Sequence, residues 1–388
     1  MNEVRETLFS ILTDYIHQSK SERSLIDEDK LAELSRIQGI GGIIYKQTRI
    51  PELSSDYFNC IYQHQNRIGL INEIINLFAE NEIPSFIVKG PIIAEYYPDP
   101  FLRTMGDVDI IVHPNNMDKA ASILELAGYH FDKNEFQREF EWHFSKNRFH
   151  FELHHALLYK ERVNNDEYVK YFDKCWDWVK SNKLNSSFHF LYVILHMRKH
   201  FLNGGIGIRF FIDLAMLSKS NDIDWPYVKR ELLKLKLLSF TIICFGLCQE
   251  WFGIKNPFED ASLTNEFICD AKNMVITNGI FGNIGNPNVI KATNLLRKYN
   301  EEDEYKSVKT RKAVYVLHTL FPPYKDIICN NTYKFVKGRP FLLPIAWIYR
   351  IFYALVTRPK ESLNELINPY KYSQEINIRE ELYKKWNL

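Results

Sequence analysis

The chain has 388 residues, of which 46% are hydrophobic and 25% charged. These are ordinary globular values, so the composition excludes a disordered, collagen-like or coiled-coil protein. At roughly 150 residues per domain, the length predicts two or three domains. Lysine and arginine number 49 against 48 aspartates and glutamates. A net charge of +1 disfavours a dedicated binder of long nucleic acid and leaves open only a local basic groove.

Three features bear on where the protein works. Six cysteines lie scattered along the chain without a CxxC pair, a pattern typical of thiols in a reducing compartment. The N-terminal stretch is acidic and amphipathic, so we expect no signal peptide. The apolar stretch from Pro340 to Val356 contains Pro344 and Arg350, and we expect it to be too short and too interrupted to span a bilayer. The sequence therefore predicts a cytoplasmic location and no membrane span.

The first 80 residues have a helical pattern. Apolar residues from Ile68 to Phe78 recur at helical spacing, and Asn81 and Pro84 end that helix. The glycine-rich stretch 39–42 resembles a phosphate loop only superficially, because no strand precedes it and the full fingerprint is missing. We therefore predict a junction between two helices there.

Between residues 84 and 160 the pattern changes to short strands and helices. Residues 85–88 and 107–112 are predicted strands, and residues 115–128 a helix that Gly128 closes. Two alternating runs, 140–144 and 149–154, flank Lys146 and Asn147, which indicates a hairpin. This segment is typical of a small mixed sheet with helices packed against it.

From residue 165 onward the pattern is helical again. Helices are predicted at 188–201, 210–217, 225–252 and 265–275. The predicted fold class is α+β, with a small mixed-sheet core between helical parts. The predicted divisions are an N-terminal helical segment at 1–80, an α/β core at 81–160 and a larger, mainly helical C-terminal domain at 161–388.

The strongest chemical signal is a pair of aspartates on the second predicted strand. Asp107 and Asp109 are two residues apart, so both carboxylates project from one face while Val108 and Ile110 project from the other. Two ionised carboxylates side by side repel each other unless a cation lies between them. Carboxylate oxygens are the hard ligands that Mg²⁺ prefers. The pair therefore predicts a metal site, although an isolated DxD is more often a solvated strand end.

Glu152 is the candidate third acidic ligand. Phe149, Phe151 and Leu153 form the apolar face of its strand. Alternation places Glu152 on the other face, together with His150 and His154. A carboxylate on a neighbouring strand can complete a two-metal site of the kind that stabilises both attacking and leaving oxygens.

Upstream residues suggest an anion pocket. Lys89 and Gly90 lie at a predicted strand-to-helix junction, where backbone N–H groups favour an anion. Lys89 adds a point charge. Arg103 precedes Asp107 by four residues and is a candidate bidentate clamp for a phosphate oxygen.

Four residues in the helical part have several possible roles. His196 and His200 are one helical turn apart, and their alternatives are Zn²⁺ binding, polar contact with an acceptor, or packing. Arg209 and Asp213 have the same spacing and are candidates for a simple ion pair. All four are candidate acceptor-side residues, because the α/β segment offers nothing that recognises an acceptor.

Two blocks carry a family resemblance. The run Phe86–Gly90 and the block Arg103–Val112, which reads RTMGDVDIIV, resemble the uncharacterised nucleotidyltransferases of the DNA polymerase β-like superfamily. In that family a Lys-Gly pair stands where most of the superfamily has Gly-Ser. The third acid usually stands as Asp before Leu-His, and here it is Glu152. The resemblance continues through His196–His200 and Arg209–Leu214 to the block Leu320–Pro323.

The resemblance implies a nucleotidyltransferase fold followed by a helical domain. The leading hypothesis is a metal-dependent enzyme that moves a nucleoside monophosphate from an NTP to an acceptor hydroxyl and releases pyrophosphate. Asp107, Asp109 and Glu152 would hold Mg²⁺ or Mn²⁺, and Lys89, Gly90 and Arg103 the triphosphate. Near-neutral charge favours a small molecule, a peptide or a protein as acceptor over long nucleic acid. The alternatives are a non-catalytic nucleotide-binding or interaction module on the same fold, and a helical interaction protein.

Overall fold

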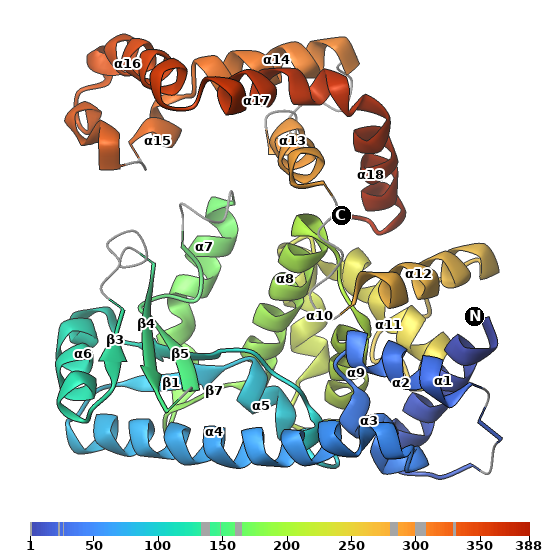
Figure 1. The fold of residues 1–388 in the computed structure, drawn as a ribbon. Coiled ribbons are helices and arrows are strands. Elements are labelled where there is room, and N and C mark those ends of the chain that lie inside the picture. The colour runs from blue at the N-terminus through green and yellow to red at the C-terminus, as the bar shows by residue number, and fades with distance from the viewer. Residues whose placement is uncertain are drawn as a thin grey trace. The chain divides into compact units, whose positions relative to one another are not determined.

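The computed structural model describes residues 2–21, 24–25, 27–132, 140–147, 149–159, 165–279, 286–298, 308–328 and 331–388. The chain divides into two compact units, one of residues 1–201 and 205–283, the other of residues 202–204 and 284–388. The first contains a small mixed sheet and the second is helical (Figure 1). The predicted α+β class is confirmed, and the division at residues 80 and 160 stays a prediction.

Four helices precede the sheet. The last and longest ends at Glu80, with Asn81 as its C-cap, as predicted. Between the second and third helices, Gly39 has φ 63°, a left-handed conformation that glycine adopts without strain. The glycine-rich stretch is therefore a helix junction, as predicted. The four helices are α1 (Asn2–His17), α2 (Glu28–Ile37), α3 (Gly41–Thr48) and α4 (Ser54–Glu80).

The sheet has five strands in the order β1-β2-β5-β4-β3. β2 and β5 run parallel, and the other neighbours are antiparallel. The predicted hairpin is confirmed, because β4 and β5 pair with Lys146 opposite Phe149. The strands are β1 (Ser85–Val88), β2 (Val108–Val112), β3 (His130–Phe131), β4 (Glu141–Lys146) and β5 (Phe149–His154).

One face of the sheet forms the core with α4 and α6 (Met117–Leu126). Both helices lie against the sheet (Figure 1), and their apolar side chains bury Val108, Ile110 and Leu153 completely. Because successive side chains of a strand point to opposite faces, Asp109 and Glu152 take the other face. Burial of the apolar residues therefore determines which face of the sheet carries the charges.

The rest of the first unit is mainly helical. The predicted single helix at 225–252 is wrong, because Lys236 adopts φ 54° and separates two helices. The N–H groups of Lys236 and Leu237 donate back to Leu233 and Leu232, which closes the first helix with a left-handed cap. The remaining elements are α5 (Gly90–Ala94), α7 (Asp166–Phe172), β6 (Val179–Lys180), β7 (Lys183–Leu184), α8 (Ser186–Asn203), α9 (Ile208–Leu217), α10 (Trp225–Lys234), α11 (Leu238–Phe252) and α12 (Asn265–Asn278).

The second unit has two small apolar clusters, one around Tyr315 and one around Ala346. Among the described residues, the segment Pro340–Thr357 alone is long and apolar enough to cross a membrane by length and composition, so the expectation that it is too short is wrong. Very little of that segment is buried. The helices are α13 (Pro287–Lys298), α14 (Val308–Leu320), α15 (Tyr324–Ile327), α16 (Leu343–Thr357), α17 (Pro359–Lys371) and α18 (Ser373–Lys385).

Candidate active site

The site begins with the pairing of the two central strands. β2 and β5 are in register with Asp109 opposite Glu152. Residues opposite each other on neighbouring strands project from the same face, and His154 shares that face because it lies two residues beyond Glu152. The sheet therefore brings together two carboxylates and an imidazole from segments more than 40 residues apart.

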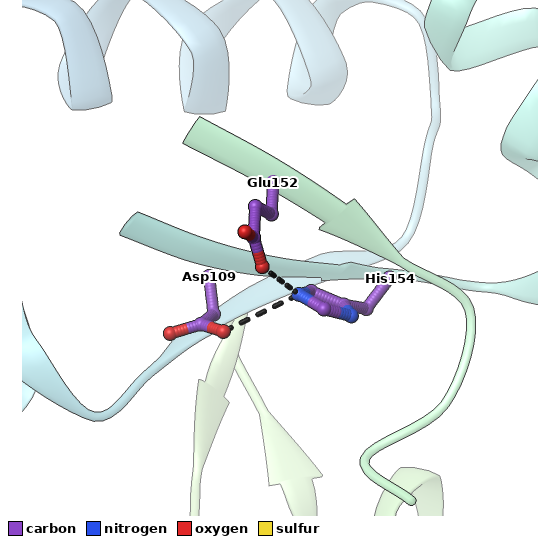
Figure 2. Close-up of side chains that lie close together, drawn as sticks. All are labelled: Asp109, Glu152 and His154. Atoms are coloured by element: carbon purple, nitrogen blue, oxygen red, sulfur yellow. Dashed lines mark hydrogen bonds and ion pairs between the residues drawn. The ribbon is translucent and has the colours of Figure 1, made fainter. Parts of the chain in front are cut away.

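His154 lies between the two carboxylates, as Figure 2 shows. Its Nε2 atom is 3.0 Å from Oε2 of Glu152 and 3.3 Å from Oδ1 of Asp109. The ligand atoms of these three residues lie within 4.8 Å of one another. Burial works to lower the pKa of His154, but the hydrogen bonds to Asp109 and Glu152 raise it above its usual value. A protonated imidazole thus offsets the repulsion between the acids.

Lys89 is the second cation of the site. Its Nζ atom donates to Oδ1 of Asp109 at 2.8 Å and lies 5.6 Å from the centre of the Tyr192 ring. The backbone N–H of Lys89 donates to Nε2 of His189 at 2.8 Å. Tyr192 and His189 both belong to α8, so this helix borders the end of the site where β1 meets α5.

The cations determine the charge of the two central acids. Burial would raise the pKa of Asp109, yet the charge of Lys89 and the hydrogen bond from His154 hold it well below its usual range. Burial also opposes ionisation of Glu152, and the hydrogen bond from His154 outweighs it, so the pKa of Glu152 is lowered. Both carboxylates are therefore ionised at neutral pH and available as ligands.

Asp107 lies at the open edge of the site. It precedes β2, is exposed, and stands outside the close group around His154. Partial burial raises its pKa, and the charges of Glu152 and Asp109 raise it further. Burial lowers the pKa of Arg67 on α4, and the charge of Asp107 works in the opposite direction and raises it. Asp107 is thus within electrostatic reach of the other two acids.

Two residues of β4 extend the same polar face. His143 is opposite Glu152 and Glu141 is opposite His154 in the β4–β5 register. Nδ1 of His143 is 3.7 Å from Oε1 of Glu152, and Glu141, His143 and Glu152 form a second close group of ligand atoms. Glu152 therefore belongs to both groups. The alternation at 140–144 is the sequence signal that points to Glu141 and His143.

Arg103 does not line an open rim, and the predicted phosphate clamp is wrong. Its Nε and Nη2 atoms donate to the two carboxylate oxygens of Asp213 at 2.8 and 2.7 Å, and Nη1 donates to the Gly90 carbonyl at 3.3 Å. The side chains of Arg103 and Asp213 are only 7% and 5% exposed. The hydroxyl of Tyr97 also donates to Asp213 at 2.6 Å. This buried pair holds the segment before β2 on α9.

Arg209 and Asp213 do not pair with each other. Arg209 donates instead to the Thr104 carbonyl at 3.0 Å, and Thr104 donates to the Gly39 carbonyl at 2.8 Å. Arg209 and Asp213 thus both hold the segment that precedes β2. Their one-turn spacing on α9 is explained by this structural role, and no contact with an acceptor is needed to explain it. Gly90 is buried as the first residue of α5.

His196 and His200 contact each other, with 2.9 Å between their Nε2 atoms. Burial lowers the pKa of His196 well below its usual value, helped by the charges of Lys89 and His200. Burial, followed by the charges of Lys199 and Lys89, lowers the pKa of His200 to about 4. Both rings are therefore neutral at neutral pH. The ring of His196 is 6.4 Å from the ring of Tyr192, which is the neighbour of Lys89, so His196 lies toward the site.

The donor set is chemically suited to a divalent cation. Two ionised carboxylates lie close together, and carboxylate oxygens are preferred by Mg²⁺ and Mn²⁺. His154 is a ligand for such an ion only after it has lost its proton, because both nitrogens of the protonated ring are donors. Residues that sequence reasoning missed are His154 as a bridge between the acids, and His189 and Tyr192 as neighbours of Lys89. The shared face of His154 and Glu152 was visible in the sequence. The contacts of Lys89 with α8 span about 100 residues, and no local pattern predicts them.

Comparison with known proteins gives one match. The model of a family described as an uncharacterised nucleotidyltransferase matches residues 24–253, which is more than half of the chain. The match includes the whole five-stranded sheet and all of helices α2 to α11. The block Leu320–Pro323, which also carried the resemblance in the sequence, lies outside it. No curated protein and no solved structure matches the chain.

Proposed function

The chain belongs to the uncharacterised nucleotidyltransferase family, and on that premise we propose that it transfers a nucleoside monophosphate from an NTP to an acceptor hydroxyl. The acceptor oxygen forms a bond to the α-phosphorus while the bond to the pyrophosphate oxygen breaks. The hydroxyl proton passes to a carboxylate of the site, and pyrophosphate leaves. The alternative of a nucleotide-binding or interaction module without transfer is considered below.

One observation carries the proposal: the carboxylates of Asp109 and Glu152 project from the same polar face. Their ligand atoms and that of His154 lie within 4.8 Å of one another. Placing charges of one sign together costs free energy, and groups of this kind cluster at functional sites. Asp107 adds a third acid, whose pKa is raised by partial burial and further by the charges of Glu152 and Asp109. Three acids at two neighbouring strands are the kind of ligand set that nucleotidyl transfer from an NTP–metal complex to an acceptor uses.

Asp107, Asp109 and Glu152 would hold Mg²⁺ or Mn²⁺. Such an ion supplies charge neutralisation at the phosphates and a lower pKa for the acceptor hydroxyl. The protein's own task is to place the acids rigidly, since positioning and charge neutralisation provide most of the rate in phosphoryl chemistry. The buried strands β2 and β5 do this, because their opposite faces pack into the core.

Lys89 is the proposed contact for the triphosphate. Its Nζ atom lies at the polar face beside Asp109, and the side chain of Lys89 is 20% exposed. Burial works to lower the pKa of Lys89, but Tyr192 and the charge of Asp109 raise it above its usual value. Lys89 is therefore a permanent cation. Arg103 acts behind it as a positioning residue through the Gly90 carbonyl.

The acceptor side is proposed to lie along α8. His196 faces the charges of Lys89 and Asp109, and its ring is neutral. A neutral imidazole can accept or donate a hydrogen bond to a hydroxyl or amide. Substitution of His196 should then impair transfer to the acceptor more than it impairs NTP binding.

Labelled nucleotides test the reaction. The purified full chain is incubated with Mg²⁺ or Mn²⁺, a cell lysate as acceptor pool, and ATP, CTP, GTP or UTP labelled at the α-phosphate. Covalent label in a small-molecule, peptide, protein or RNA fraction identifies the acceptor class, and Asp109→Asn should abolish it. ATP labelled at the γ-phosphate is the control, because a phosphoryl transfer would label the acceptor from that position only.

One observation favours the non-catalytic alternative. His154 and Lys89 already neutralise Asp109 and Glu152 without any metal ion. A site that is internally balanced in this way could bind a nucleotide and release it unchanged. Nucleotide binding measured by calorimetry, with no pyrophosphate released and no label transferred under any metal, would establish that alternative in place of the enzyme.

A further inference from the structure

Helix α16 in the second unit carries an apolar stripe on its outer face. The stripe residues follow one another at intervals of four, three, four and three, which places them on one side of a helix. Ile348 is 70% exposed and Phe352 67% exposed. Large exposed apolar patches on proteins mark interaction surfaces. The stripe consists of Ile345, Ile348, Phe352 and Leu355 of α16 and of Phe341, which lies just before the helix in the 3₁₀ turn Pro340–Leu342.

The opposite side of α16 contacts protein over the first half of the helix. Ala346 is buried in a cluster with Tyr333 and Val336, and Trp347 packs against it. Nε1 of Trp347 donates to the Pro322 carbonyl at 2.8 Å. These contacts fix the rotation of the helix about its axis. The stripe is therefore the outward side of a packed helix.

The charge around the stripe has a single sign. From residue 327 to residue 360 the sequence contains six lysines and arginines and no aspartate or glutamate, whereas the whole chain has a net charge of only +1. The exposed cations Lys337 and Arg339 precede the helix, and Arg358 and Lys360 follow it. Cations that flank an exposed apolar and aromatic face are typical of helices that lie in a membrane interface.

We propose that the outer face of α16 binds the surface of an anionic lipid bilayer, with the helix lying in the plane of the membrane. The stripe would enter the boundary between headgroups and acyl chains, and the flanking cations would contact anionic headgroups. A second copy of the chain is a poorer occupant, because two surfaces with this charge repel each other. A membrane-spanning arrangement would strip Ala346 from its cluster and break the bond from Arg350 to the Thr319 carbonyl.

Vesicle binding by the full chain tests the proposal. The probes are vesicles of phosphatidylcholine alone and of an equimolar mixture of phosphatidylcholine and phosphatidylglycerol, in low and in high salt. We expect binding to the mixed vesicles only, weakened by salt because headgroup charges are screened. Absence of binding to mixed vesicles, or equal binding to both kinds, would overturn the proposal.

Two matched pairs of variants identify the surface. Ile348→Ser should weaken binding about tenfold, because one buried isoleucine is lost from the interface. Ile378→Ser is its control, since Ile378 is 68% exposed on α18 and should leave binding unchanged. Replacing Arg358 and Lys360 by glutamine should weaken binding roughly thirtyfold. The same change at the exposed pair Lys384 and Lys385 is the control and should have little effect.

Two outcomes would assign the stripe elsewhere. A dimer detected by light scattering for the wild type, and lost in Ile348→Ser, would make the stripe an interface between copies and overturn the proposal. A large fall in melting temperature for Ile348→Ser, without any wild-type binding to mixed vesicles, would show that the stripe packs inside the protein. Nucleotidyl transfer is assayed separately with a soluble acceptor, so failure of the proposed function leaves this test intact.

Discussion

Two groups of charged side chains lie close together in the first unit and are built in opposite ways. In the buried pair behind α5, both oxygens of Asp213 receive hydrogen bonds from Arg103, and Tyr97 donates another. At the polar face of the sheet, Lys89 and His154 both approach the same oxygen of Asp109. In the pair around Asp213 all hydrogen bonds of the carboxylate are made, whereas at the face around Asp109 the acids Asp107, Asp109 and Glu152 outnumber the cations Lys89 and His154, which compensate them only in part.

The difference indicates what each group is for. A buried ion pair with all its hydrogen bonds made costs the protein heavily when one partner is removed. A site with like charges held together stores electrostatic free energy that a ligand can release. We therefore expect substitutions at Asp213 to affect stability, and substitutions at Asp109 to affect chemistry. The predictions below run from the largest expected effect to the smallest.

Asp109→Asn should reduce nucleotidyl transfer by roughly three to four orders of magnitude, because several kcal/mol of charge stabilisation are lost and each 1.4 kcal/mol is tenfold. The measurement is initial rate of α-label transfer. The melting temperature should fall moderately, because Lys89 and His154 lose the charge that they pair with, while removal of one acid relieves repulsion on Glu152. A variant with full activity would remove Asp109 from the chemistry.

Asp213→Asn should give the reverse result. It leaves the buried guanidinium of Arg103 uncompensated, so we expect the free energy of unfolding to fall by about 3 kcal/mol or more. Urea unfolding measures it. The control is the double variant Arg103→Met with Asp213→Leu, which removes both charges and should recover much of the loss. Equal destabilisation by the single and double variants would contradict the ion-pair explanation.

His189 lies between the two groups, and its effect depends on pH. Burial lowers the pKa of His189 to about 4, and the charges of Arg103 and Lys89 contribute. An unfolded histidine has a pKa of about 6.5. Between pH 7 and pH 5 the unfolded chain takes up a proton that the folded chain does not, so stability falls with decreasing pH, by up to about 2 kcal/mol from this residue.

The test compares His189→Gln with the wild type in urea unfolding at pH 7 and pH 5. Glutamine can still accept a hydrogen bond but cannot be protonated in this range. The difference in stability between the two pH values should therefore be smaller in the variant. The same pH dependence in both proteins would mean that other groups, such as His196 and His200, account for it.

Lys89→Ala should show the smallest effect, a loss of nucleotide affinity of about tenfold, the order expected for one charge-assisted contact. Calorimetric titration with a non-hydrolysable NTP measures it. Lys89→Met is the control, because it keeps the aliphatic stem beside Tyr192 but removes the charge, and should bind as weakly as the alanine variant. Unchanged affinity in both would reduce Lys89 to a structural partner of Asp109.

Local patterns predicted most of the elements and the main acids. The strand at 85–88 matches β1, and the alternation around Lys146 gave the β4–β5 hairpin. The single helix predicted at 225–252 failed because apolar residues continue through the break, and a left-handed residue such as Lys236 leaves no mark on hydrophobic periodicity.

The partners of the charges were harder to predict. One-turn spacing on α9 suggested a pair between Arg209 and Asp213, but the carboxylate of Asp213 is bound by Arg103, which is 110 residues away in the sequence. Spacing along a helix shows which side chains share a face. It does not show that the fold places the guanidinium of Arg103 beside Asp213, where it takes the position expected for Arg209. The alternation of residues along β5 predicts that His154 shares a face with Glu152. The contacts of Lys89 with α8 depend instead on how the helices pack on the sheet.

The backbone of Lys89 limits which side chains can stand at this point of the site. Its φ of 59° is one that glycine adopts freely and other residues adopt at a cost. The cation beside Asp109 is therefore held at a backbone cost, which the hydrogen bond from its own N–H to His189 and the contact of its Nζ atom with Asp109 must offset. Lys89→Gly would relieve that cost and remove the cation in one step, so it would keep the backbone turn while taking the positive charge out of the site.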